Sequence, residues 1–230
     1  MDTNGATVVV TGATRGIGRA VAETFAEAGS HVVVCGRDGD AVESTADELP
    51  GAATGLRADV RDEFDVERLM ETAAKAGGDG IDCVVANAGV YHGDPGDTPT
   101  HEESYAAVDD HLRTNVRGVF ATLREAVPHL AEGARALVTT GSVARQAMPG
   151  IGSYGASKAG AEGVARAFAA DLEQPVGCVD PGQVATDLSG PGGRDPEEVA
   201  ELFLWAATEA DADELDGEVL GLREWKTATR

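Results

Sequence analysis

The stretch "ATVVVTGATRGIG", residues 6–18, decides the fold of this chain. It begins as an uninterrupted apolar run, which is typical of a strand buried on both faces. Gly12, Gly16 and Gly18 follow and lead into a helical segment over 16–29. Glycines at such a turn let backbone N–H groups approach a pyrophosphate at the helix N-terminus, where the helix dipole favours anions. The stretch therefore predicts a strand–turn–helix unit that binds phosphates.

The same alternation of apolar runs and helical segments continues along the chain. Further strands are predicted over 31–36, 52–59, 83–89, 136–142, 176–182 and 218–222, and helices over 39–49, 62–76, 104–131, 154–172 and 195–210. The strands lack a polar face, as expected when helices cover both sides of a sheet. We expect one α/β domain over 1–230, a Rossmann-type doubly wound parallel sheet of about seven strands with helices on both faces.

The charge of the chain limits its partners. It has 40 acidic and 18 basic residues, a formal net charge of −22. Such a charge repels nucleic acid and anionic membranes, so neither is an expected partner. Lysine is confined to Lys75, Lys158 and Lys226. The acid excess together with this scarcity favours adaptation to high salt, where screening shortens self-repulsion, over an ordinary acidic protein.

Targeting and metal-binding signals are weak. No apolar run approaches the roughly 20 residues that span a bilayer, and no basic N-terminal region precedes an apolar segment. We therefore expect a soluble, cytoplasmic protein. Cys35, Cys83 and Cys178 lie in or beside apolar runs without a C-x-x-C pattern, and the five histidines show no metal spacing. Buried cysteines and no metal site are the expectation.

The segment "SYGASKAG", residues 153–160, places Tyr154 and Lys158 one helical turn apart on one face. Alone, such a pair is usually an ordinary feature of a helix surface. A second interpretation is a proton-transfer pair, because a nearby lysine cation favours the ionised form of tyrosine.

The spacing of Gly12, Gly16 and Gly18 resembles that of the short-chain dehydrogenase/reductase family, in its single-domain branch. The likeness extends over nearly the whole chain. It includes, in order, "ADV" (58–60), "NAG" (87–89), "TNVRG" (114–118), Ser142, the Tyr154/Lys158 pair and "PGQVAT" (181–186).

This resemblance implies an NAD(P)-dependent oxidoreductase that interconverts an alcohol with a ketone or aldehyde, 3-oxoacyl compounds among them. Its partners would be this small-molecule substrate and further copies of the chain. The implied cofactor-binding residues are Gly12, Thr14, Arg15, Gly16, Ile17, Gly18, Arg37, Asp59, Val60, Asn87, Ala88, Gly89, Tyr154, Lys158, Pro181, Gly182, Val184 and Thr186.

The resemblance also implies a role for each catalytic residue. Tyr154 would be the general acid/base, and Lys158 would hold the nicotinamide ribose and lower the pKa of the tyrosine. Ser142, at a strand end, would hydrogen-bond the substrate oxygen. Asn115 would hold a water that links Lys158 to solvent; alternatively, its side chain bonds backbone.

The end of the second predicted strand bears on the choice of cofactor. An acid about 20 residues beyond the glycine turn would bond the ribose 2′-hydroxyl of NAD. Here that position is Gly36, followed by Arg37, and arginine suits a 2′-phosphate. Arg15 is a plausible second contact, so NADP(H) is favoured. NAD(H) remains possible if Asp38 turns inward instead.

The chain departs from the family pattern in two loops. Ser142 and Tyr154 are twelve positions apart, usually one more in relatives, and only eight residues separate Thr186 from Asp195. The short substrate loop near 187–195 predicts an open site or a lid completed by another subunit. The family usually assembles through its two long helices, which implies a homodimer or homotetramer. An NAD-dependent alcohol or sugar dehydrogenase, and a non-catalytic dinucleotide sensor or scaffold, stay open as alternatives.

Overall fold

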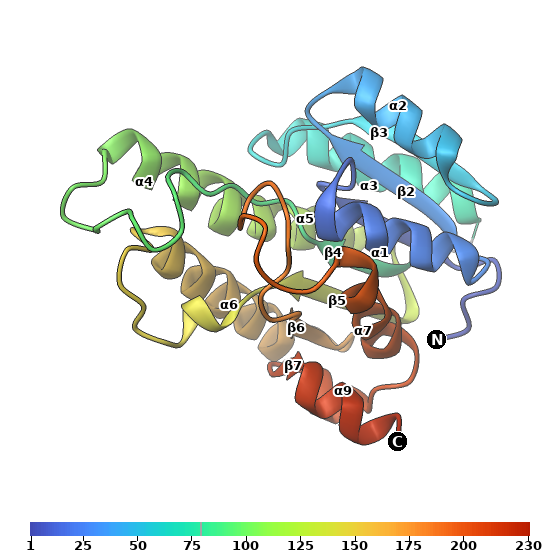
Figure 1. Ribbon diagram of the computed structural model, residues 1–230. Coiled ribbons are helices and arrows are strands. Elements are labelled where there is room, and N and C mark those ends of the chain that lie inside the picture. The colour runs from blue at the N-terminus through green and yellow to red at the C-terminus, as the bar shows by residue number, and fades with distance from the viewer. Residues whose placement is uncertain (79) are drawn as a thin grey trace.

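A computed structural model describes residues 1–78 and 80–230 of the chain. Within them, seven strands form one sheet in the order β3-β2-β1-β4-β5-β6-β7, and every neighbouring pair is parallel. The strands are β1 (Thr7–Thr11), β2 (His31–Gly36), β3 (Ala53–Arg57), β4 (Ile81–Ala86), β5 (Leu130–Thr139), β6 (Val176–Asp180) and β7 (Val219–Gly221). The predicted doubly wound parallel sheet is confirmed (Figure 1).

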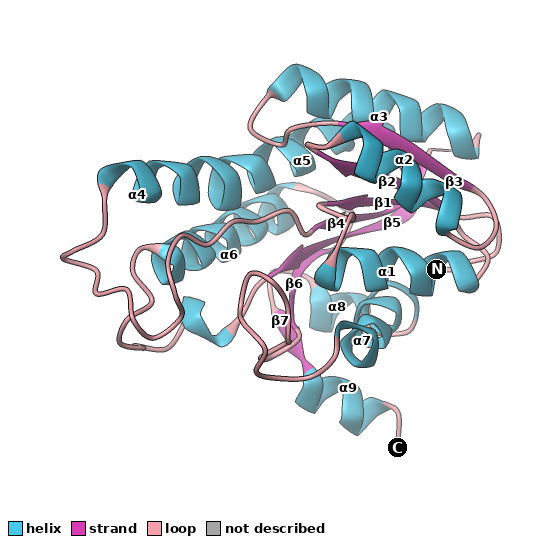
Figure 2. Ribbon diagram, turned by 45° about the horizontal axis from the view of Figure 1, so that its top comes forward, coloured by secondary structure: helices cyan, strands magenta, loops and turns pink. Residues whose placement is uncertain are grey.

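Helices cover both faces of this sheet (Figure 2). They are α1 (Gly16–Glu27), α2 (Gly39–Glu48), α3 (Glu63–Gly77), α4 (Tyr105–His111), α5 (Gly118–Ala126), α6 (Tyr154–Asp171), α7 (Pro196–Thr208), α8 (Ala212–Leu215) and α9 (Leu222–Ala228). Short helical turns are η1 (Leu112–Arg117), η2 (Val127–His129) and η3 (Ser142–Ala144).

The first strand shows why the apolar runs have no polar face. Val8 and Val10 join the core that contains residues of α1 and α7, whereas Val9 joins the core formed with α3 and α5. All three side chains are fully buried. Successive side chains of a strand point to opposite faces, so a sheet covered on both sides requires apolar residues at every position.

Two predicted boundaries are wrong around residue 130. The helix expected over 104–131 is divided into α4, the π-helical turn η1, α5 and the 3-10 turn η2, and β5 already begins at Leu130. The pairing of β5 with β4 is irregular between Ile81 and Cys83, and Gly133 has a φ of +76°. The early part of β5 is thus polar and irregular, which hid it from a search for apolar runs.

The strand order also places the site. The sheet grows in opposite directions from β1 and β4, so their carboxyl ends border the crevice in which open α/β sheets bind ligands. The glycine-rich turn follows β1 and the "NAG" segment follows β4. In the part of the chain that the structure describes, no helix is long and apolar enough to cross a membrane.

Candidate active site

The glycine-rich turn packs directly against the segment that follows β4. Gly12 and Gly16 have φ values of +66° and +54°, which favour glycine. A Cβ on Gly12 would lie 2.8 Å from the Cα of Ala88, and one on Gly18 would lie 2.3 Å from the carbonyl oxygen of Gly12. The turn is therefore a cradle of bare backbone at the N-terminus of α1.

Asn87 holds this cradle in place. Its Nδ2 donates to the carbonyl oxygens of Thr11 and Gly12, at 3.0 and 3.2 Å. Its own backbone N–H donates to Thr11 Oγ1, and its Oδ1 accepts a hydrogen bond from Thr139. The side chain predicted as a cofactor contact thus also links the ends of β1, β4 and β5.

A cavity of about 490 Å³ runs from the glycine turn to α6. Its lining contains most of the predicted site residues, namely Gly12, Thr14, Arg15, Gly16, Ile17, Gly18, Arg37, Asp59, Val60, Asn87, Ala88, Gly89, Tyr154, Lys158 and Thr186. Five predicted residues lie outside this lining, namely Asn115, Ser142, Pro181, Gly182 and Val184. The volume is within the usual range for a cofactor site, about 300–1,000 Å³.

Several lining residues were missed by the sequence analysis. They include Arg61, Thr114 and Thr139. Two of them had a signal, because Arg61 directly follows "ADV" and Thr114 directly precedes Asn115. Arg61 pairs with Asp59 at 2.7 Å and with Asp110 at 2.9 Å. Its hydrogen bonds hold the pKa of Asp59 below the ordinary value.

Arg37 and Asp38, the two residues after β2, have different roles. Arg37 lines the cavity. Asp38 instead caps α2, because its Oδ1 accepts the backbone N–H groups of Asp40 and Ala41 at 3.1 and 3.2 Å. A carboxylate in this position satisfies donors that the helix leaves free. Turning Asp38 toward a ribose would break that cap.

Tyr154 and Lys158 lie at the other end of the cavity. Tyr154 is the first residue of α6, and the Lys158 Nζ lies 5.9 Å from its ring centroid. Lys158 donates a hydrogen bond to the carbonyl oxygen of Thr139 at 2.9 Å, at the end of β5. Lys158 therefore connects α6, the helix that also carries Tyr154, to the end of β5.

Lys158 was expected to lower the pKa of Tyr154, and the structure shows the opposite shift. Burial raises the pKa of Tyr154 to about 12, and burial lowers the pKa of Lys158 to about 8. Both shifts have one cause, because a poorly solvated site disfavours the charged form of either group. In this state the phenol of Tyr154 keeps its proton at neutral pH.

Ser142 does not lie on a strand, so that expectation is wrong. β5 ends at Thr139, and Ser142 begins the 3-10 turn η3 as a half-buried residue. Between them, Thr140 Oγ1 donates to Glu162 Oε1 at 2.8 Å and draws the chain toward α6. The strand end itself supplies the carbonyl that binds Lys158.

Asn115 lies in the π-helical turn η1, and its side chain is engaged by protein groups. Its Nδ2 donates to the Val90 carbonyl and to Ser157 Oγ, both at 2.9 Å, and its Oδ1 accepts the Val90 N–H at 2.8 Å. The side chain therefore bonds backbone, as the alternative expected, and the water-holding role of Asn115 stays a prediction. A Cβ on Gly89 would lie 3.3 Å from Asn115 Oδ1 and 3.8 Å from Lys158 Nζ, so Asn115 still borders the lysine. Single π-helical turns are frequent at functional sites.

The short loop near 187–195 folds back toward the glycine turn. The backbones of Thr186 and Gly190 exchange hydrogen bonds, and Thr186 Oγ1 contacts Ser189 Oγ at 2.7 Å. Asp187 pairs with Arg15 across the cavity mouth at 3.5 Å. Ala185 to Leu188 form part of the cavity wall, and whether the loop leaves an open site or needs a lid from another subunit stays a prediction.

Taken together, these residues fit a nicotinamide dinucleotide. A Cβ would fill the glycine cradle, an arginine lines the cavity after β2, and a tyrosine and a lysine lie where the cavity reaches α6. The cradle and arginine suit phosphate groups. The tyrosine and lysine suit a reaction that moves a proton.

Known proteins are similar to this chain in sequence and in structure. The rabbit (Oryctolagus cuniculus) L-fucose dehydrogenase is 33% identical over 192 residues, covering 80% of this chain; the match spans only 64% of the relative. A short chain dehydrogenase from Burkholderia cenocepacia, solved with NADP, has a TM-score of 0.85, 26% identity, and coverage of 96% of this chain and 97% of its own. A 3-ketoacyl-(acyl-carrier-protein) reductase from Brucella melitensis, solved with NADH, has a TM-score of 0.86, 26% identity and the same coverages.

The profile of one protein family matches most of the chain. It is described as "short chain dehydrogenase" and matches residues 6–196, from the start of β1 to the start of α7. That range contains the glycine cradle, the lysine–tyrosine pair and the whole cavity lining. This chain belongs to the short chain dehydrogenase family, whose members are oxidoreductases that act on alcohol and carbonyl groups with a nicotinamide dinucleotide.

Proposed function

We propose that the protein is an NADP(H)-dependent reductase of a small-molecule ketone or aldehyde, with Tyr154 as the general acid/base. One observation carries the choice of cofactor. Arg37 lines the cavity, whereas the carboxylate of Asp38, the group that would otherwise favour NAD, is occupied as the cap of α2. A permanently charged guanidinium is suited to the 2′-phosphate of NADP.

The chain's own residues divide the work of binding. The backbone of the glycine turn and the N-terminus of α1 would hold the pyrophosphate. Arg37 would hold the 2′-phosphate, joined by Arg15, whose side chain and its partner Asp187 are exposed and so weakly paired. We expect Pro181, Gly182, Val184 and Thr186 to flank the nicotinamide, which supplies a hydride when the cofactor is bound.

The proton chemistry follows from the two buried groups. With a pKa raised to about 12, Tyr154 is protonated at neutral pH and can donate its proton to a carbonyl oxygen. Lys158, with a pKa near 8, is a cation at the same pH and stabilises the phenolate that remains. Ser142 would hydrogen-bond the substrate oxygen as it gains charge. At neutral pH both Tyr154 and Lys158 thus carry a proton, and the reduction of a carbonyl requires a protonated Tyr154.

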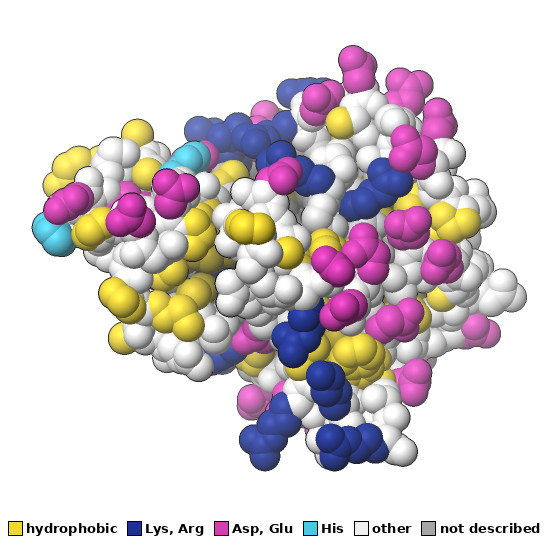
Figure 3. Space-filling model, viewed as in Figure 1, with side chains coloured by type: hydrophobic (Ala, Val, Ile, Leu, Met, Phe, Trp, Pro, Cys, Tyr) yellow, Lys and Arg dark blue, Asp and Glu magenta, His cyan; other side chains and the backbone are white. Residues whose placement is uncertain are grey.

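The substrate and the conditions are part of the same proposal. The walls of the substrate region would come from the loops 90–97, 143–151 and 188–194, and 3-oxoacyl compounds are among the candidate substrates. We expect the enzyme to work in the cytoplasm at high salt. Acidic side chains are dispersed over the face that carries α1 and α2 rather than gathered in one patch, consistent with adaptation to high ionic strength (Figure 3).

A screen of cofactor oxidation tests this function. The protein is mixed with NADPH or NADH and a panel of ketones, aldehydes, 3-oxoacyl thioesters and sugars, in dilute buffer and in concentrated KCl. The expected result is turnover with NADPH and a carbonyl, faster at high salt. Equal use of NADH would refute the role of Arg37, and best activity in dilute buffer would refute the high-salt adaptation.

A second candidate is an NAD-linked sugar or alcohol dehydrogenase. It is favoured by the similarity to L-fucose dehydrogenases, which recurs in the cow, mouse and rat proteins. The screen run in the oxidative direction, with L-fucose and NAD or NADP, distinguishes the two functions.

We also propose that the protein forms a homodimer or homotetramer. Phe120 of α5 is 45% exposed, and its ring lies 5.5 Å from that of Phe168 of α6. The exposed Phe120 ring therefore lies where α5 meets α6, and association would bury it there. Light scattering coupled to size exclusion at high salt gives the mass; a monomer would contradict this proposal.

A further inference from the structure

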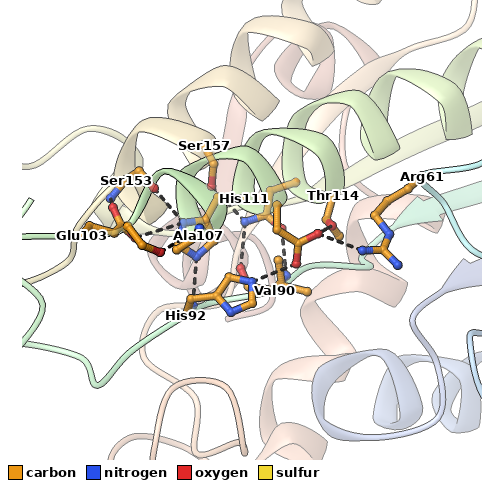
Figure 4. A network of polar contacts seen from close by, with 12 residues as sticks. Arg61, Val90, His92, Glu103, Ala107, His111, Thr114, Ser153 and Ser157 are labelled. Atoms are coloured by element: carbon orange, nitrogen blue, oxygen red, sulfur yellow. Dashed lines mark hydrogen bonds and ion pairs between the residues drawn. The ribbon is translucent and has the colours of Figure 1, made fainter.

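A cluster of buried polar side chains lies outside the roles assigned so far (Figure 4), and it includes the residue that directly precedes Tyr154. It consists of Glu103, before α4; His111, the last residue of α4; and Ser153, which precedes α6. The side chains of Glu103 and His111 are 2% and 0% exposed. Such groups are seldom buried without a specific set of partners.

Glu103 is bound to the start of the helix that carries Tyr154. Its Oε2 accepts the backbone N–H of Ser153 at 2.6 Å. Its Oε1 has no hydrogen-bond partner among the described residues and lies 3.4 Å from His111 Nδ1. A Cβ on Gly152 would lie 2.9 Å from this carboxylate, so the chain before Ser153 is also packed against it.

The hydrogen bonds of His111 define its tautomer. Its Nε2 lies 2.9 Å from the backbone nitrogen of His92, which can only donate, so Nε2 accepts. Its proton is therefore on Nδ1, which lies 2.7 Å from Ser153 Oγ and faces Glu103. His111 thus joins the loop after β4, through His92, to the start of α6, through Ser153.

Contacts between aromatic rings also connect this cluster to Tyr154. The Tyr91 ring is parallel to His111 within 12°, with centroids 5.9 Å apart, and lies 4.9 Å from the ring of Tyr154. The His111 and Tyr154 rings are 6.0 Å apart, edge to face. Tyr154 is consequently restrained both through its backbone, at Ser153, and through its ring.

The cluster is difficult to explain as a contribution to stability. Burying a carboxylate is costly when one of its oxygens lacks a partner, as that of Glu103 does within residues 1–78 and 80–230, and well-packed apolar side chains at such sites are often more stabilising. What hydrogen bonds provide, and apolar contacts do not, is a defined orientation. We propose that Glu103 and His111 are positioning residues that hold Tyr154 in its reactive orientation, a role that rests on the function of Tyr154 proposed above.

Four variants test this role. His111→Leu removes both hydrogen bonds. His111→Asn keeps a donor near the position of Nδ1, and His111→Gln keeps an acceptor near the position of Nε2. Glu103→Gln keeps the acceptor for the Ser153 N–H and removes the charge. Tyr105→Ser is the matched control, because Tyr105 is the first residue of α4 and is 90% exposed.

We expect a loss in kcat without a loss in cofactor binding. Misplacing a reactive group by about 1 Å can lower the rate about 100-fold, so His111→Leu should lower kcat by about that factor. His111→Asn and His111→Gln should each recover part of it, and Glu103→Gln should lie between His111→Leu and wild type. The Kd for NADPH should stay within about twofold throughout, because these residues lie outside the cavity lining.

Three results of the kinetic and binding measurements would overturn the proposal. They are a folded His111→Leu variant with a kcat near wild type, Asn and Gln variants no better than Leu, and a kcat loss matched by an equal loss of NADPH affinity. A readout without turnover separates this failure from failure of the proposed function. The NMR signals of the Tyr154 ring, assigned with Tyr154→Phe, should shift in His111→Leu and stay unchanged in Tyr105→Ser, even if no carbonyl is reduced; unchanged signals in His111→Leu would also refute the role.

Discussion

The two ends of the cavity differ in whether backbone or side chains form the site. At the glycine turn, binding depends on bare backbone, and the residues that form it lie within 12–18 of the sequence. At the α6 end, the site depends on side chains, and Glu103, His111 and Tyr154 come from separate segments. The first end is sensitive to the addition of atoms. The second end is sensitive to the loss of particular hydrogen bonds.

The two ends also differ in what they cost the fold. The glycine cradle is held by Asn87, which donates hydrogen bonds to the carbonyl oxygens of Thr11 and Gly12. The α6 end holds a buried lysine whose pKa is lowered to about 8 and a buried carboxylate, one oxygen of which has no hydrogen-bond partner in the part of the chain that the structure describes. Destabilising groups of this kind are typical of functional sites rather than of cores. Substitutions at the glycine turn should therefore change cofactor binding, whereas substitutions at the α6 end should change kcat.

The largest effect is expected for Tyr154→Phe, which leaves the ring and removes the proton donor. General acid–base groups contribute roughly 10²–10⁴-fold, so kcat should fall by about that factor. The Kd for NADPH, measured by fluorescence titration, should change by less than about twofold. Activity close to wild type would mean that another residue supplies the proton.

Arg37→Asp should have the next largest effect, at the opposite end. Hydrogen bonds to charged groups contribute about 1.5–3 kcal/mol, so the preference for NADPH over NADH should fall by about 10- to 100-fold. The ratio of kcat/KM for the two cofactors gives the answer, and kcat with NADH should stay within about twofold. An unchanged ratio would show that Arg37 does not meet the 2′-phosphate.

Gly18→Ala tests whether the cradle excludes side-chain atoms. Its Cβ would lie 2.3 Å from the Gly12 oxygen and 2.4 Å from Asn87 Nδ2, so the turn must shift. Such overpacking costs about 1–3 kcal/mol, and we expect NADPH affinity about tenfold weaker and a lower Tm. Gly163→Ala in α6 is the control, because its Cβ would meet only a side-chain atom of Arg166, at 4.0 Å. Equal NADPH affinity in both variants would contradict the cradle.

The smallest expected effect is a gain in stability from Lys158→Met at neutral pH. The pKa of Lys158 is about 8 in the fold against 10.5 ordinarily, so the unfolded chain binds more protons between these values. Stability therefore rises with pH over that interval, and the full cost of the buried cation is present below about pH 8. Removing it should add about 1–3 kcal/mol at pH 7, partly offset by the lost bond to Thr139.

This gain should shrink as the pH rises toward 10. Urea unfolding of the wild type and Lys158→Met at pH 7 and pH 9.5 measures it, with Lys75→Met as the control because the Lys75 side chain is 77% exposed. A variant less stable than wild type at pH 7 would show that hydrogen bonding outweighs the burial of the charge.

Much of the fold was open to prediction, because its signals are local. Apolar runs of a few residues predict the strands β1, β2 and β6, and the glycines after β1 predict the turn. Positions where the signal was not local were predicted wrongly. The start of β5 at Leu130 is irregular and carries polar residues, and β5 ends at Thr139, so that Ser142 begins a 3-10 turn instead.

The sequence by itself determined the parallel sheet, the phosphate cradle, and the residue types of the reaction, because these depend on periodicity and on spacing within one turn or helix. Only the tertiary structure decided how those residues are tuned. Burial raises the pKa of Tyr154, although the neighbouring lysine was expected to lower it, and Glu103 meets Ser153 across 50 residues of chain. Desolvation and long-range hydrogen bonds depend on what the fold packs around a group, and no local pattern records that.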